Sequence, residues 1–283
     1  MNTIGQPGSA ARGRLLSLAA ALAILAAIAY WLLAPSPEPP PPPAAAAPPP
    51  AATPPPLPES VREAPDIPPP PPGEGAEEAE AQHEAPPLPP LAESDPWARE
   101  LLAPLVADSP LAPALSGEGI LQRAAAAVEV LARGGISYKA LPLKPPREPF
   151  RVRREEDRLY LDPANYARYE PLVDALTALP PEAVAGAFHR LRPLFEEAFA
   201  ELGQPAEVAD NALVAAIDQL LAAPEVEEPV TLVRETVTYQ FADPALEALP
   251  PAQKFMIRIG PDNRRRLARW LGEVRAALLA GND

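Results

Sequence analysis

The sequence PEAVAGAFHRLRPLFEEAFAEL at residues 181–202 carries a clear helical pattern. Its apolar residues recur every three or four positions and so share one helix face; they are Val184, Ala187, Phe188, Leu191, Leu194, Phe195 and Phe199. Pro181 suits a first helical turn, and Gly203 is typical of the position after a helix end. Pro193 should kink this helix or divide it in two, because it removes a backbone hydrogen bond.

Similar patterns on both sides of this stretch extend the helical prediction. Apolar residues again share one face in three segments where we expect helices, residues 118–133, 206–222 and 263–279. An Asp-Pro pair also precedes each of three other helical patterns, at residues 95–96, 162–163 and 243–244. Aspartate caps free backbone amides and proline suits the first helical position, so capping explains these pairs.

Signals for β-strands are few. Residues 149–161, PFRVRREEDRLYL, alternate in polarity and turn at residues 155–157, which predicts a β-hairpin. Residues 230–233 and 236–241 are rich in β-branched side chains and are either further strands or extended segments. The predicted fold class is therefore a mainly α domain with a small β-hairpin element.

The prolines are concentrated before this domain. Of 45 prolines in the 283-residue chain, 24 fall between Pro35 and Pro90. That segment is almost only Pro, Ala and Glu, so it has too few large apolar side chains to offset the entropy of ordering. Extended polyproline II at about 3.1 Å per residue would let it reach roughly 170 Å. We predict a disordered proline-rich linker over residues 35–92 and a mainly helical domain over residues 93–283.

An apolar run stands before the linker. Residues 15–34, LLSLAAALAILAAIAYWLLA, contain no charge and are long enough to cross a bilayer as one helix. Arg12 and Arg14 precede the run, and positively charged flanks stay in the cytoplasm. We predict a cytoplasmic N-terminus at residues 1–14, a single transmembrane helix anchored in the lipid bilayer of the bacterial inner membrane, and a periplasmic C-terminal domain.

The same run allows a second interpretation. Ala27-Ile28-Ala29 has the small-x-small form that signal peptidase accepts, so cleavage would give a secreted soluble protein. Against cleavage, the apolar run continues past this point, beyond the usual length of a signal peptide's apolar region.

Composition and motifs restrict the classes of function that this chain can have. The net charge of −14 argues against nucleic-acid binding. The chain has no Cys and only two His, His83 and His189, so a zinc site is not expected. No serine-nucleophile or phosphate-loop motif is present, so we assign no catalytic, cofactor or metal residues and do not expect an enzyme. The alternative is a cell-wall-active enzyme using acidic residues, for which the sequence offers Glu196, Glu197 and Glu201.

Tyrosines close to Arg, Asn and Gln are the candidate partner-binding residues. Tyr166 and Tyr169 are three positions apart and so share a helix side. Tyrosines beside such polar groups suit a peptide or sugar surface, although the rings could instead fill the core. The candidates are Arg158, Tyr160, Asn165, Tyr166, Arg168, Tyr169, Tyr239 and Gln240.

Three motifs carry a family resemblance: RLYLDPANYARYEPLV at 158–173, YQFADPALEAL at 239–249 and IRIGPDN at 257–263. With the apolar run and the linker, they resemble a bacterial family of membrane-anchored proteins, the domain of unknown function 3014, over about residues 93–281. The resemblance implies the anchored layout and assigns no activity. We therefore expect a membrane-anchored periplasmic binding or scaffold protein whose partner is an envelope protein or a cell-wall component.

Overall fold

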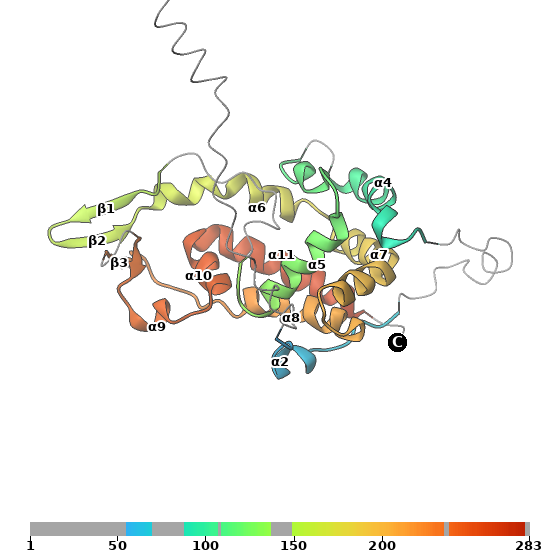
Figure 1. The fold of residues 1–283 in the computed structure, drawn as a ribbon. Helices are drawn as coiled ribbons and strands as arrows, with labels where there is room; N and C mark the ends of the chain where they lie inside the picture. The colour runs from blue at the N-terminus through green and yellow to red at the C-terminus, as the bar shows by residue number, and fades with distance from the viewer. Residues whose placement is uncertain (1–54, 70–87, 107–108, 137–148, 235–237, 281–283) are drawn as a thin grey trace, which may run out of the picture. The chain divides into compact units, whose positions relative to one another are not determined.

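Three helices form the centre of the fold. In the computed structural model they are α5 (Ile120–Ala132), α7 (Pro181–Glu201) and α8 (Ala209–Leu221), which pack against one another (Figure 1). Apolar side chains from all three meet in one core, where Ala125 and Ala212 are fully buried. The helices predicted over residues 118–133, 181–202 and 206–222 are thus confirmed, with a short 3-10 turn, η4 (Ala206–Val208), before α8.

The structure describes most of the domain. The described residues are 55–69, 88–106, 109–136, 149–234 and 238–280. They belong to one unit of the chain, Thr53–Asp283. The predicted N-terminus at residues 1–14 and the anchor at residues 15–34 lie outside the described residues. No helix within the described ranges combines the length and apolar character needed to cross a membrane.

Helix α7 continues through Pro193 as one helix, so the chain is not divided there. Leu191 and Leu194 lie on either side of this proline, and both are buried. Their packing in the core outweighs the single backbone hydrogen bond that proline removes.

A second core surrounds α11 (Pro261–Leu279), which confirms the helix predicted over residues 263–279. This helix packs against α6 (Glu170–Thr177), α7 and α8. Trp270 Nε1 donates a hydrogen bond to Leu179 O at 2.8 Å, which links α11 to the end of α6. The buried residues of α11 recur at helical spacing, and the apolar ones are Leu267, Leu271, Val274 and Leu278.

Four short strands form an antiparallel sheet in the order β1-β2-β3-β4. One face of the sheet covers a third apolar core, which includes Leu161, Leu232 and Ile257 of α10 (Pro251–Arg258). The predicted hairpin is β1 and β2 and is confirmed, and the two β-branched segments supply the other strands. The strands are β1 (Val152–Glu155), β2 (Arg158–Leu161), β3 (Thr231–Val233) and β4 (Gln240–Phe241).

Two Asp-Pro pairs cap the elements that follow them, as predicted. Asp162 accepts a hydrogen bond from Ala164 N at 2.9 Å before η3 (Pro163–Arg168). The matching bond, from Ala245 N to Asp243 at 2.8 Å, starts α9 (Pro244–Glu247).

The first Asp-Pro pair serves a different helix. Asp95 is the first residue of α4 (Asp95–Val106), and its carboxylate accepts hydrogen bonds from Gly119 N at 2.7 Å and Ile120 N at 2.8 Å. It therefore satisfies free amides at the start of α5, where an anion is also favoured by the helix dipole. Two 3-10 turns flank α4, η1 (Leu91–Glu93) and η2 (Ala112–Leu115).

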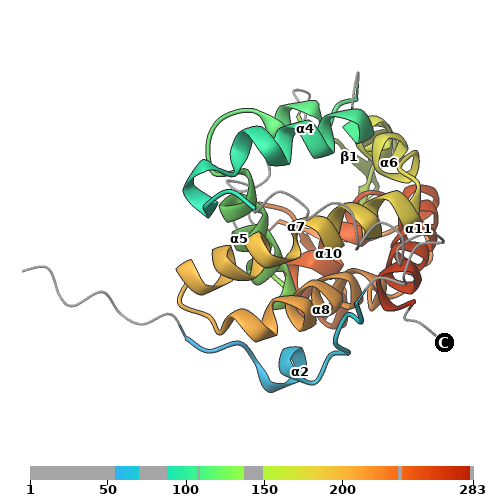
Figure 2. The same ribbon diagram turned by 90° about the vertical axis from the view of Figure 1, so that its right-hand side faces the viewer.

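The prediction of a disordered linker over residues 35–92 is wrong for residues 55–69, which we call the strap. It is also wrong at residues 88–92, where η1 begins and Leu91 is buried in the first core. The strap contains the short helix α2 (Glu59–Arg62), which lies beside α8 (Figures 1 and 2). Leu57, Val61 and Ile67 of the strap are only 2–3% exposed. The prediction relied on the average composition of residues 35–92, which does not show that these three apolar side chains lie close together. Their burial against the helices offsets the entropy cost of ordering the strap.

Candidate functional site

The outer face of the sheet brings three predicted residues together. Side chains alternate along a strand, so Leu161 and Phe241 point to the buried face while Tyr160 and Gln240 point to the other. Arg158 is two positions from Tyr160 and shares its face. From β1, the Arg153 guanidinium carbon lies 5.8 Å from the centre of the Tyr160 ring. An aromatic ring thus lies among polar and cationic groups on a strand scaffold.

Tyr239 belongs to a separate aromatic group. Its ring centre lies 5.7 Å from that of Phe150, which is 37% exposed. The Arg234 guanidinium carbon lies 5.3 Å from the centre of the Tyr239 ring. Tyr239 and Gln240 are adjacent, so their side chains point to opposite sides of the sheet. Tyr239 packs beside the third core, whereas Gln240 lies on the outer face.

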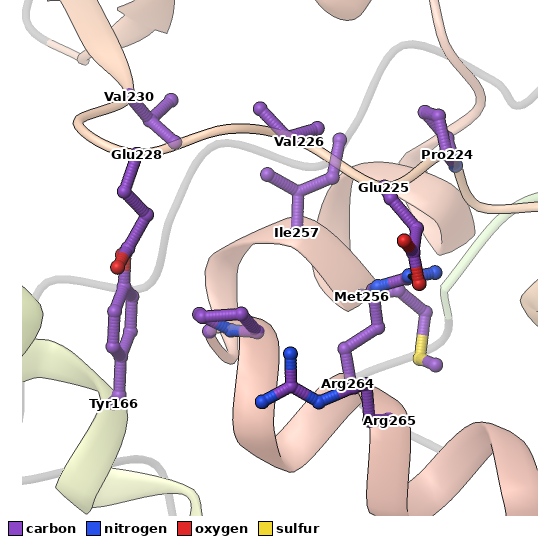
Figure 3. A pocket seen from close by; sticks show the side chains of 12 residues that line it. Tyr166, Pro224, Glu225, Val226, Glu228, Val230, Met256, Ile257, Arg264 and Arg265 are labelled. Carbon is purple, nitrogen blue, oxygen red and sulfur yellow. Dashed lines mark hydrogen bonds and ion pairs between the residues drawn. The ribbon is translucent and has the colours of Figure 1, made fainter.

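Tyr166 contacts both the segment before β3 and the start of α11. Its hydroxyl donates a hydrogen bond to Glu228 Oε1 at 2.5 Å, and Figure 3 shows the two side chains pointing toward each other. Burial raises the pKa of Tyr166, and the hydrogen bond to the Glu228 carboxylate raises it further. The ring also lies against Gly260, where an added Cβ would be 2.4 Å from Tyr166 Cγ. Gly260 has φ +90°, so both space and backbone conformation require glycine.

The pocket beside Tyr166 is small (Figure 3). Its volume is about 80 Å³, far below the roughly 300–1,000 Å³ of most small-molecule sites. Its principal cation is already engaged, because Arg264 donates to Ala223 O at 2.9 Å and pairs with Glu225. The pocket therefore does not have the dimensions of a cofactor or metabolite site.

Asn165 is buried, and Tyr169 is partly buried against the second core. Asn165 is 1% exposed, and its amide exchanges hydrogen bonds with the backbone of Arg151 at 2.7 and 2.9 Å. Arg168 Nη1 donates to Asn165 Oδ1 at 3.2 Å. The Tyr169 ring packs edge-on to Phe255 in the second core, with the centres 5.8 Å apart. Contact between a partner and Asn165 would require this side chain to leave its present position, whereas Tyr169 offers only part of its ring.

A further group of side chains binds the strap, residues 55–69. No pattern in the sequence predicted these contacts. At one end, Arg133 donates to Pro55 O at 2.6 Å and to Pro56 O at 3.1 Å. Gln204 Nε2 also donates to Pro55 O, at 3.1 Å. At this end of the strap, side chains of the domain thus bind backbone carbonyls of two successive prolines.

At the other end of the strap, α7 and α8 supply the donors. Asn211 Nδ2 donates to Ala64 O at 2.6 Å and to Asp66 Oδ1 at 2.8 Å. Arg192 Nη1 donates to Ile67 O at 3.0 Å. We define the strap site as Arg133, Arg192, Gln204 and Asn211, together with the apolar surface that buries Leu57, Val61 and Ile67.

A buried ion pair supports the strap site. Asp210 is 4% exposed and pairs with Arg192, which also donates to Glu196 Oε1 at 3.0 Å. Burial raises the pKa of Asp210, and the Arg192 guanidinium lowers it in part. The two carboxylates hold the guanidinium in place, so its remaining donor is directed at the strap.

The acids of α7 and His189 have different surroundings. Glu196 is engaged with Arg192, whereas Glu197 and Glu201 are exposed. Burial lowers the pKa of His189, and Arg192 contributes to this. Within the described ranges, no three Asp, Glu or His side chains lie together as a metal-binding group.

The comparisons with known proteins give one positive result. The family model described as Protein of unknown function (DUF3014) matches residues 120–275, from the start of α5 into α11. No curated protein and no solved structure matches the chain. The family match covers more than half of the chain and contains all four strands, α5 to α10 and most of α11, while the strap lies before it. The chain therefore belongs to the DUF3014 family.

Proposed function

We propose that this protein is a binding or scaffold protein of the bacterial envelope. Residues 15–34 anchor it in the inner membrane, with the N-terminus in the cytoplasm and the helical domain in the periplasm. The uncharged length of residues 15–34 and the preceding arginines support this topology. The partner is an envelope protein or a cell-wall component.

The outer face of the sheet is the observation that carries this proposal. Tyr160 and Gln240 are half-buried there, while Arg153 and Arg158 are exposed. A tyrosine that is held in place offers a large contact area at small entropic cost, and arginine adds hydrogen bonds and stacking. Such a surface suits a peptide or a glycan rather than a buried small substrate.

Site-specific photo-crosslinking in living cells tests the surface. A photoreactive phenylalanine derivative at Tyr160 should give a discrete adduct, and the same residue at Phe241 should give none, because Phe241 is 3% exposed on the buried face of the same sheet. A protein adduct would identify an envelope protein. Binding of the purified chain to isolated cell wall, lost in Tyr160→Ala, would identify a wall component. Absence of both results would contradict the proposed binding surface.

The topology has a separate test, which the lack of cysteine makes simple. Single cysteines are introduced as Ser9→Cys, before the apolar run, and Ser116→Cys, at an exposed position in the domain. A membrane-impermeant maleimide should label only the second variant in intact spheroplasts, and both after lysis. Labelling of Ser9→Cys in intact spheroplasts would contradict the topology, as would protection of Ser116→Cys.

A further inference from the structure

The strap is bound by side chains of the domain. Within the described residues, its backbone-to-backbone hydrogen bonds are local, between positions 58 and 64. The domain instead reaches the strap through side chains. Donors of the strap site bind the carbonyls of Pro55, Pro56, Ala64 and Ile67, and the Asp210 carboxylate accepts a hydrogen bond from the Ile67 backbone amide. Segments that belong to a core usually satisfy their backbone by secondary structure, whereas bound peptides are held by side chains.

The chemistry of the strap matches that of its site. Six of the fifteen strap residues are proline, which has no backbone donor but presents a carbonyl. Its named partners Arg133, Arg192, Gln204 and Asn211 act as donors toward it. Proline also restricts the backbone of the free segment, so less entropy is lost on binding.

Three apolar side chains anchor the strap at two places. Leu57 and Val61 belong to the first core, and Ile67 belongs to the second core. The strap therefore crosses from one core to the other, and its polar contacts lie close to each anchor. A peptide with apolar residues at this spacing is specified by both its side chains and its carbonyls.

We propose that the strap site is a peptide-binding site and that residues 55–69 are its ligand in the same chain. The ligand class is a proline-containing peptide with one short helical turn, α2, which presents carbonyls at Pro55 and Pro56 and apolar side chains at Leu57, Val61 and Ile67. The 18 residues at 70–87 join this ligand to the rest of the domain. A short link of this kind gives an effective concentration of about millimolar, which keeps even a weak ligand bound.

The full chain with a protease site inserted within residues 70–87 tests this proposal. After cleavage, a fluorescent synthetic peptide of residues 53–69 should bind the cleaved protein and displace the N-terminal fragment, measured by anisotropy. The peptide carrying Ile67→Asp should bind at least about tenfold more weakly, because it places a charge in the second core. The Glu63→Gln peptide is the matched control, and it should bind unchanged because Glu63 is exposed.

A substitution in the strap site tests the same contact from the side of the domain. Asn211→Ala in the cleaved protein should weaken peptide binding about five- to tenfold, because Ala64 O and Asp66 lose their donor. Absence of peptide binding would overturn the proposal, and so would equal binding of the wild-type and Ile67→Asp peptides. A cleaved chain that loses its helical circular dichroism when the N-terminal fragment leaves would also overturn it.

Hydrogen exchange on the intact chain provides a test without cleavage. Asn211→Ala should accelerate amide exchange in residues 55–69 and leave exchange in α11 unchanged. That result is expected if the strap opens independently of the helices. Equal acceleration in the strap and in α11 would overturn the proposal, because the strap would then be an integral part of the core.

Discussion

Helix α11 and the strap both lie against the same helices, but they are held there in different ways. Helix α11 buries Leu267, Leu271, Val274 and Leu278 at regular spacing and satisfies its own backbone. The strap buries three apolar side chains at irregular spacing and gives its carbonyls to side chains of the domain. The local sequence of α11 thus already favours its helical conformation. The strap is ordered only by its contacts with the strap site.

The largest effect is expected from a cavity in α11. Leu267→Ala should lower the free energy of unfolding by about 2–5 kcal/mol, since Leu267 is 4% exposed in the second core. Urea denaturation of the full chain, followed by circular dichroism, measures this loss. A change below about 1 kcal/mol would show that α11 is not an integral part of the cooperative unit.

The start of α11 gives the next largest effect. Gly260→Ala should destabilise the domain by about 1–3 kcal/mol, because the new Cβ meets the Tyr166 ring and φ is +90°. Adding Tyr166→Ala removes the contact but leaves the backbone strain. The loss caused by Gly260→Ala should therefore be smaller in a Tyr166→Ala background, as a double-mutant cycle would measure. Strictly additive losses would contradict the contact.

The strap should respond less than α11 to the same kind of substitution. Ile67→Ala should lower the free energy of unfolding by at most about 2 kcal/mol, because the strap can leave its site while the helices stay folded. The measurement is the same urea denaturation, in parallel with Leu267→Ala. A loss equal to that of Leu267→Ala would remove the distinction between the two regions.

The smallest effect is a pH dependence of strap binding. Burial raises the pKa of Asp210 and outweighs the other causes: Arg192 and the hydrogen bond from the Ile67 backbone amide lower the pKa, while Glu196 and Asp66 raise it. An acid with a raised pKa binds its proton more readily in the buried state, so lower pH should favour the bound strap. The peptide should therefore bind more tightly as the pH falls from about 7 to about 5. Asp210→Asn should reduce this dependence, whereas weaker binding at the lower pH would contradict the assignment.

The difference between the two regions also bears on the proposed function. With the strap bound, residues 35–54 lie between the proposed anchor and the domain, and a chain of that length spans at most about 60 Å at the rise of polyproline II. With the strap released, residues 35–87 would separate anchor and domain, and a chain of that length spans at most about 160 Å at the same rise per residue. The strap site would then set how far from the membrane the domain binds its partner.

The binding surface was only partly predictable. Arg158, Tyr160 and Gln240 could be assigned to one face because alternation along strands is a local property, once the strands are known. The burial of Asn165 and Tyr169 was not predictable, because it depends on Arg151 and Phe255 from other parts of the chain. The strap carried a weak signal, namely three large apolar residues in a segment of Pro, Ala and Glu.

The sequence by itself determined the main helices, the β-hairpin and two of the three Asp-Pro caps. Helical periodicity, strand alternation and capping act between residues a few positions apart, so they can be recognised without knowledge of the fold. Only the tertiary structure decided that Asp95 caps α5, 24 residues away, and that Gln204 holds Pro55, 149 residues away. Such contacts depend on which surfaces the packed helices bring together, and no local pattern encodes that.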